Sequence, residues 1–240
     1  MTNTDAAQKP RRFYRDVDVA PADQGFVVRL DRRTAKTPRG APLAAPTEAL
    51  AGLLAAEWAG QREQIDITGM PATRLAFTAI DRSPEARDGM AEEVARYAGS
   101  DLLCYLADDP LALAEREAAV WGPWLSWADQ SLGVRLKPVI GISPTTQDPE
   151  AIAGVRALAA ALDDFELTAL VFAAGLYGSA VLALAVQRGV LGGADAFELS
   201  RLDEAFQEER WGVDEEAAER TERLRSEAAM IDRWFAALRR

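Results

Sequence analysis

Hydrophobic and polar residues alternate in two short stretches near the start of the chain. The first spans residues 13–19 and the second spans residues 25–30. A period of two places successive side chains on opposite faces of a strand, so both stretches are predicted to be strands. Residues 31–33 follow as a predicted tight turn into an extended stretch at 34–37, which Pro38 ends. We therefore expect a small antiparallel sheet built from hairpins.

The hydrophobic period changes to that of helices after Pro46. Thr47 is a suitable N-cap for a helix that ends near residue 64, and Pro71 suits the first turn of a second helix that ends near Asp81. A third helix is predicted at 83–98. The rest of the chain has the same character, and the further predicted helices are 115–132, 149–162, 165–188, 193–210 and 213–238.

This change of period predicts an α+β protein, with a small N-terminal antiparallel β-containing domain followed by an all-helical C-terminal domain. We expect a flexible tail at 1–10, an N-terminal domain of β-hairpins and helices at 11–108, and a helical domain at 109–240. The tail has neither the apolar segment of a signal peptide nor the Arg-rich pattern of a transit helix. A cytoplasmic protein of a bacterium is therefore expected.

The stretch 167–186 contains 20 residues without a charge, which is the length that spans a bilayer. It is rich in Ala, however, and it also contains the polar residues Thr168 and Ser179. A helix that is apolar on all sides is equally typical of the centre of a helical bundle. We favour the bundle, in which Gly175 and Gly178 would let a neighbouring helix approach closely. We therefore expect that the chain is not an integral membrane protein.

The composition excludes several kinds of chemistry. The 240 residues include no His and one Cys, so there is no Ser-His-Asp or Cys-His nucleophile, no His-containing metal site and no internal disulfide. Lys and Arg number 27 against 38 Asp and Glu, a net charge of −11 that argues against nucleic acid as a partner. The charge is uneven, because residues 1–40 hold nine basic and five acidic side chains.

Carboxylates are the remaining candidates for acid–base chemistry or for a hard metal ion. The adjacent pairs are Asp108/Asp109, Asp163/Asp164 and Glu215/Glu216. Neighbours in sequence point to different faces of a helix, and the chain has neither a calcium-loop spacing nor a Gly-rich phosphate loop. A solvated acidic surface is the favoured interpretation, and we expect no metal and no cofactor.

Two polar residues interrupt the apolar face of the helix that begins after Thr47. That face is made by Leu50, Leu53, Leu54 and Trp58. At 100° per residue, Glu57 and Gln61 fall along the same stripe, and a buried carboxylate is costly without hydrogen-bond donors. An internal hydrogen-bond network is favoured over a binding role. The alternative from another class is a carboxylate-dependent hydrolase with Glu57 as general acid or base, which would need a closed pocket and a second carboxylate.

The predicted helix 193–210 presents polar and aromatic side chains opposite its core. Its apolar stripe is made by Leu199, Leu202 and Phe206. Glu204, Gln207 and Trp211 share the other side, which the packing of this helix does not need. An exposed Trp is typical of a protein interface. The competing interpretation is that Trp211 covers the following helix and that Glu204 is merely solvated.

Several of these residues belong to an ordered set of motifs along the chain. The set is Arg12-Phe13-Tyr14, Leu30-Asp31, Lys36-Thr37-Pro38, Glu57-Trp58 with Gln61, Met70-Pro71, Ala79-Ile80-Asp81, Asp101 to Tyr105, Ser200-Arg201-Leu202 with Glu204 and Gln207, and Trp211-Gly212. In order and spacing it resembles the assembly chaperones of the F-type ATP synthase catalytic head that handle the alpha subunit. The resemblance extends from about residue 11 to about residue 220.

The resemblance implies a non-enzymatic function. Chaperones of this family hold newly made alpha subunit through its nucleotide-binding domain and are displaced by the beta subunit. Carried over by motif, Glu204, Gln207 and Trp211 are the expected partner-binding residues. Trp58, between Glu57 and Gln61, is expected to be a structural determinant. We expect a monomer, and the chain departs from the family's pattern at Arg32, where a turn glycine is expected.

Overall fold

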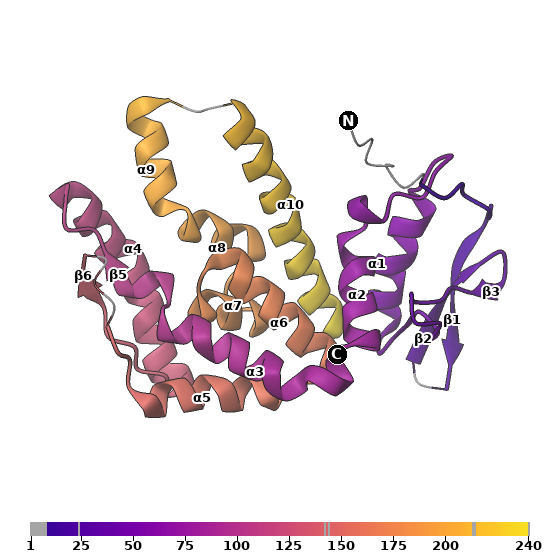
Figure 1. The fold of residues 1–240 in the computed structure, drawn as a ribbon, viewed down its shortest axis with the longest axis horizontal. Helices are drawn as coiled ribbons and strands as arrows, with labels where there is room; N and C mark the ends of the chain where they lie inside the picture. The colour runs from indigo at the N-terminus through magenta and orange to yellow at the C-terminus, as the bar shows by residue number, and fades with distance from the viewer. Residues whose placement is uncertain (1–8, 24, 142, 144, 213–214, 240) are drawn as a thin grey trace, which may run out of the picture. The chain divides into compact units, whose positions relative to one another are not determined.

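The computed structural model describes residues 9–23, 25–141, 143, 145–212 and 215–239 (Figure 1). The chain divides into two compact units. The N-terminal unit combines Met1–Arg82 with Ala237–Arg240, and the helical unit is Ser83–Ala236. The expected tail at 1–10 lies largely outside the described residues. The division also differs from the expected domain boundary at 108/109, because the helix that begins at Ser83 packs against later helices of the helical unit.

The N-terminal unit contains the antiparallel sheet. Its strands are β1 (Val17–Ala22), β2 (Gly25–Leu30), β3 (Arg33–Thr34) and β4 (Ala44–Ala45). β2 pairs with all three of the others, so the order is β1-β2-β3 with β4 also on β2. The small antiparallel sheet is confirmed, but its first strand does not begin at residue 13. Residues 10–12 pair instead with the loop after the first helix, through Arg12 N to Glu63 O and Ile65 N to Pro10 O.

A two-residue turn joins β2 to β3. Asp31 and Arg32 both have positive φ, at 48° and 67°, which is the backbone of a type I′ hairpin turn. The Asp31 carboxylate accepts hydrogen bonds from the backbone N–H groups of Arg15 and Asp16, at 3.0 and 2.9 Å. These two bonds lower the pKa of Asp31 and tie the turn to the segment that leads into β1.

Two helices complete the N-terminal unit, α1 (Glu48–Ala59) and α2 (Pro71–Asp81). The sheet packs against α1, and Val28, Leu50 and Leu54 are fully buried there. Thr47 is the N-cap of α1, as predicted, with its hydroxyl 3.1 Å from Leu50 N. The same hydroxyl donates to the carbonyl of Ala237 at 2.7 Å, so the end of the chain belongs to this unit.

The helical unit is built around a short helix that is buried on all sides (Figure 1). Its helices are α3 (Ser83–Gly99), α4 (Leu111–Trp127), α5 (Pro149–Ala160), α6 (Asp164–Tyr177), α7 (Ala180–Gln187), α8 (Gly193–Ser200), α9 (Leu202–Trp211) and α10 (Glu215–Leu238). Every residue from Ala180 to Val186 in α7 is buried. α3 packs along α5 and α6, and α6 packs on α7.

The predicted single helix at 165–188 is wrong, because the structure breaks it into α6 and α7. Gly178 ends α6 with a φ of 63°, a conformation that favours glycine. Ser179 then caps α7 by accepting from Leu182 N at 3.1 Å. Gly175 lies against α3, where an added Cβ would sit 3.2 Å from the Tyr97 hydroxyl. Among the described residues, no helix is both long enough and apolar enough to cross a membrane.

Other predicted helices also change their limits. The helix at 193–210 is two helices that meet at Arg201, and the one at 115–132 begins at Leu111 and ends in a π-helical turn, Ala128–Leu132. The first two residues of the helix at 213–238 lie outside the described residues. A two-residue parallel pair, β5 (Tyr105–Leu106) with β6 (Val139–Ile140), was not predicted.

Candidate functional site

The polar and aromatic face of α9 is open to solvent. Leu202 and Phe206 are each 7% exposed and fix one side of the helix in the helical unit. Glu204 and Gln207 are exposed on the other side, and Trp211 is 82% exposed. Trp211 therefore does not cover α10, which was the competing interpretation. The interior does not hold these side chains in place, so they are free to contact another molecule.

Charged pairs hold α9 against its neighbours. Arg116 of α4 makes an ion pair with Glu209, with its Nη1 2.9 Å from both carboxylate oxygens. Arg201, at the break before α9, donates to Thr221 of α10 and to Glu208, the latter at 2.9 Å. The exposed face is thus presented by a helix whose other sides are anchored to α4 and α10.

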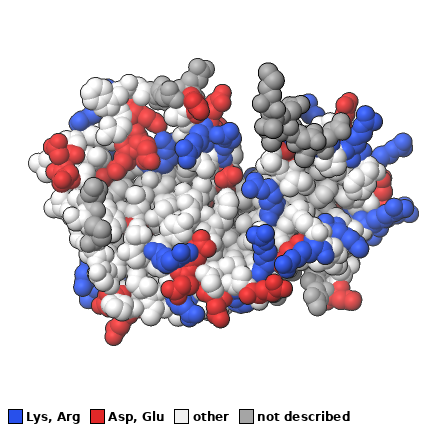
Figure 2. Space-filling view, viewed as in Figure 1, with Lys and Arg blue, Asp and Glu red and all other residues white. Residues whose placement is uncertain are grey.

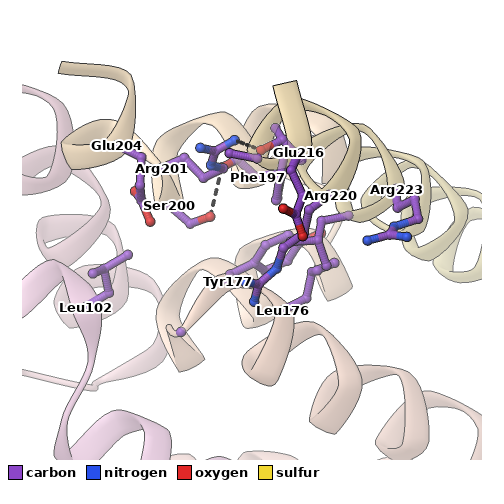
Figure 3. A pocket seen from close by; sticks show the side chains of 14 residues that line it. Leu102, Leu176, Tyr177, Phe197, Ser200, Arg201, Glu204, Glu216, Arg220 and Arg223 are labelled. Atoms are coloured by element: carbon purple, nitrogen blue, oxygen red, sulfur yellow. Dashed lines mark hydrogen bonds between the residues drawn. The ribbon is translucent and has the colours of Figure 1, made fainter. Parts of the chain in front are cut away.

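A groove with a volume of about 690 Å³ lies beside this face, between α8, α9 and α10 (Figure 3). Leu102, Leu176 and Phe197 provide apolar surface within it. Its charged side chains come from α9, from α10 and from the break before α9, and they are Arg201, Glu204, Glu216, Arg220 and Arg223. Glu204 is the residue that belongs both to the groove and to the exposed face. Such a mixed lining suits a polypeptide surface better than a single small charged ligand.

Glu57 and Gln61 are hydrogen-bonded inside the N-terminal unit. The Glu57 carboxylate accepts from the backbone N–H groups of Ala72 and Thr73, at 2.8 and 2.7 Å. It therefore caps the start of α2, where Met70 supplies no side-chain cap. Gln61 donates to the Glu57 carbonyl at 3.1 Å and accepts from Asp66 N at 2.7 Å.

These bonds remove the basis of the hydrolase interpretation. Both Glu57 oxygens are engaged by backbone amides, and the residues that contact them carry no second carboxylate. Within the described parts of the chain, no three Asp, Glu or Cys side chains come together as metal ligands. Trp58 is 6% exposed, and its carbonyl accepts from the Tyr14 hydroxyl at 2.8 Å, so this ring is part of the core between the N-terminal segment and α1.

Comparison with known proteins identifies the family of this chain. The family model described as ATP12 chaperone protein matches residues 11–129. The crystal structure of Atp12 from Paracoccus denitrificans is 41% identical, with a TM-score of 0.89, over 96% of this chain and 99% of that one. The chain belongs to the ATP12 chaperone family.

Two further ATP12 relatives extend the comparison. An aspartate-to-lysine mutant of the Paracoccus denitrificans Atp12p is 40% identical, with a TM-score of 0.89, over 96% of this chain and 98% of that one. The mitochondrial protein atp12 of Schizosaccharomyces pombe is 26% identical in an alignment 225 positions long, which covers 87% of this chain and 76% of that protein. This ATP12 family member is accordingly a chaperone of ATP synthase assembly and not an enzyme.

The sequence interpretation missed one ionisable residue of this family member. Glu117 of α4 is fully buried, and it lies in line with the buried residues Leu113 and Trp121. Its Oε2 accepts from Ala107 N at 2.6 Å, whereas Oε1 has no donor among the residues that the structure describes. Burial, followed by the nearby carboxyl group of Asp203 in α9, raises the pKa of Glu117 to about 7. Glu117 stands four residues after Leu113 and four residues before Trp121, so helix periodicity places it on their apolar face. That spacing was the signal available in the sequence.

Proposed function

We propose that this ATP12 family member binds the unassembled alpha subunit of ATP synthase and prevents its aggregation until the beta subunit takes its place. The observation that supports it most directly is the exposed face of α9, formed by Glu204, Gln207 and Trp211. A solvent-exposed Trp beside polar groups is the kind of anchor that fills a pocket on a partner. We further propose that the protein acts in the bacterial cytoplasm.

The groove beside α9 supports a contact with a protein surface. An unassembled subunit exposes apolar surface that its neighbour later covers. The groove offers apolar side chains surrounded by charged ones, a composition typical of interfaces that form and separate. Release to the beta subunit requires only that this contact be weaker than the final interface of the assembled enzyme.

The proposal predicts that the purified protein suppresses aggregation of isolated alpha subunit at about equimolar ratio. Light scattering measures the suppression, and a pull-down with separately expressed alpha and beta subunits measures the selectivity. Aggregation that proceeds unchanged, together with no alpha subunit in the pull-down, would contradict the proposal. Capture of the beta subunit alone would contradict the choice of partner.

Glu204→Lys tests the face itself. Reversing a charge in an exposed, partner-facing position is expected to weaken binding of alpha subunit by about tenfold or more, with an unchanged melting temperature. Glu115→Lys is the matched control, because Glu115 is also an exposed helical glutamate of the helical unit but lies on α4. Equal binding by the two variants would remove Glu204 from the interface.

A further inference from the structure

A second groove lies in the N-terminal unit and shares no lining residue with the groove beside α9. It has a volume of about 430 Å³. Three segments enclose it: the chain before β1, the β2–β3 hairpin and the loop after α1. Their apolar side chains line it, and they are Pro10, Phe13, Leu30, Ala35, Ile65 and Ile67. Trp58 of α1 completes the lining.

The walls of this groove are fixed. Backbone hydrogen bonds join Arg12 N to Glu63 O at 2.9 Å and Ile65 N to Pro10 O at 2.8 Å. Lys9 adds an ion pair with Asp66 at 2.6 Å. The segment that carries Phe13 is therefore held beside the loop after α1, and the groove is a formed feature of the unit.

The apolar lining is only partly covered by the protein itself. Leu30, Ile65 and Trp58 form the inner part and are each between 4 and 6% exposed. Phe13 is 73% exposed, which is unusual for an aromatic side chain beside other apolar groups. Its ring meets Tyr14 edge to face at 5.3 Å, but most of its surface faces solvent. An apolar side chain from another molecule could cover Phe13 and the inner residues together.

Polar features of the same groove narrow the choice of ligand. The exposed cations Arg33 and Lys36 line it, and within the described residues neither makes an ion pair. Figure 2 shows Lys and Arg gathered over the unit that contains β1, β2 and β3. The indole N–H of Trp58 is buried and has no acceptor in the described structure. That nitrogen has almost no accessible surface, so Trp58 meets a ligand through the rest of its ring, and its N–H resonance can report on the groove.

We propose that this groove binds an extended peptide segment of a client protein, in which a large apolar side chain stands next to an acidic residue. The apolar side chain covers Phe13 and the inner lining, which includes Trp58, and the carboxylate meets Arg33 and Lys36. The proposal rests on the proposed function in so far as the client is an ATP synthase subunit. It adds a contact in the N-terminal unit to the one on α9.

The direct test follows the indole N–H resonances of the full-length protein by two-dimensional NMR, with the Trp58 signal assigned by comparison with Trp58→Phe. The probe is a capped tetrapeptide, Asp-Phe-Leu-Asp, and the matched probe is Lys-Phe-Leu-Lys. We expect the acidic peptide to shift the Trp58 signal in a saturable manner, because the indole ring lines the groove and a bound peptide changes its surroundings. The basic peptide should leave it in place.

Charge reversal at the groove provides the controls. Lys36→Glu and Arg33→Glu are expected to weaken binding of the acidic peptide by about tenfold or more, whereas Arg74→Glu, an equal change on an exposed position of α2, should not. Equal binding of both peptides, or no effect of either groove variant, would overturn the proposal. So would saturable binding of laurate without binding of the peptide, since a fatty acid has the same apolar and anionic parts.

The outcome is independent of the test for the α9 face. Capture of alpha subunit without any peptide effect at Trp58 would overturn the groove proposal alone. Peptide binding without capture of alpha subunit would overturn the choice of client and leave the groove assignment standing.

Discussion

Arg32 occupies a backbone conformation in which most residues are strained. Its φ of 67° lies in the left-handed region, and the preceding Asp31 is also there, at 48°. In a type I′ turn the second position is the one most often filled by glycine. The arginine is exposed and lines a shallow hollow on the sheet, so it gains little packing in return. At position 32 the family's pattern suggests glycine, and the backbone conformation of Arg32 also favours glycine.

Arg32→Gly is therefore expected to stabilise the protein by about 1 kcal/mol, because it removes the Cβ from a left-handed residue. Chemical denaturation of both proteins measures the difference. Arg33→Gly serves as the control, since Arg33 is in β3 and has no positive φ, and this variant should lose stability. A loss of stability in Arg32→Gly would show that the arginine side chain contributes more than the strain costs.

Glu117 makes stability depend on pH. Its pKa is about 7 in the folded protein against an ordinary value of 4.5. Between these values the unfolded chain releases the proton while the folded protein keeps it, so stability falls as pH rises through this window. Buried Asp101, whose pKa burial raises to about 6, acts in the same direction. Above pH 7 the protein should therefore be less stable than it would be if both side chains kept their ordinary pKa values.

Glu117→Gln is expected to remove one of these contributions. The amide can still accept from Ala107 N and can donate to Asp203 at every pH. Its gain in stability over the parent should therefore be larger at about pH 8.5 than at about pH 4.5. Denaturation curves at both pH values measure it. An identical difference at the two values would mean that Glu117 does not titrate in the folded protein over this range.

Two helical glycines differ in the space around them. Gly193, at the start of α8, approaches α10 so closely that an added Cβ would lie 2.3 Å from the Ala228 carbonyl oxygen. Gly52, in the middle of α1, has no atom within 4 Å of such a Cβ. The same substitution should thus have opposite effects in the two helices.

Gly193→Ala is expected to cost about 1–3 kcal/mol, because the backbone of α8 or α10 must move. Gly52→Ala should gain about 0.5–1 kcal/mol from helix propensity alone. Thermal unfolding of the two variants beside the parent protein checks both signs. Since α8 and α10 border the groove beside α9, Gly193→Ala should also weaken capture of alpha subunit, whereas Gly52→Ala should not. A neutral Gly193→Ala would contradict the close approach.

The sequence predicts elements well where one residue decides them locally. Thr47 and Pro71 mark the starts of α1 and α2 because capping and a fixed φ act within one turn. The break at Gly178-Ser179 has an equally local cause, but the long apolar run conceals it. The β5–β6 pair and the Glu117–Asp203 contact join segments far apart in the chain, and no local pattern specifies such contacts.

The candidate surface shows the same limit. Helix periodicity places Glu204, Gln207 and Trp211 opposite the buried Leu202 and Phe206, and the structure has them exposed. Periodicity does not reveal the groove that Glu204 shares with α10, since residues of α10 follow only after the chain has turned back. The groove that contains Phe13 and Trp58 likewise depends on three separate segments.

The two units of the molecule differ in charge as well as in fold. Residues 83–236 contain 13 basic and 28 acidic side chains, whereas residues 1–82 contain 12 basic and ten acidic ones. The α9 face is therefore part of an acidic body, and the groove with Arg33 and Lys36 is part of a slightly basic one. Each proposed contact selects a different surface on its client, which favours correct recognition over mere adhesion to exposed apolar groups.

The order in which the chain is synthesised gives the Thr47–Ala237 hydrogen bond a further meaning. Residues 1–82 are synthesised long before residues 237–240, yet both segments belong to one unit. The contacts of the earlier segment are therefore complete only after more than 150 further residues have been translated. A chain that is terminated between the two segments lacks a piece of the unit that was translated first.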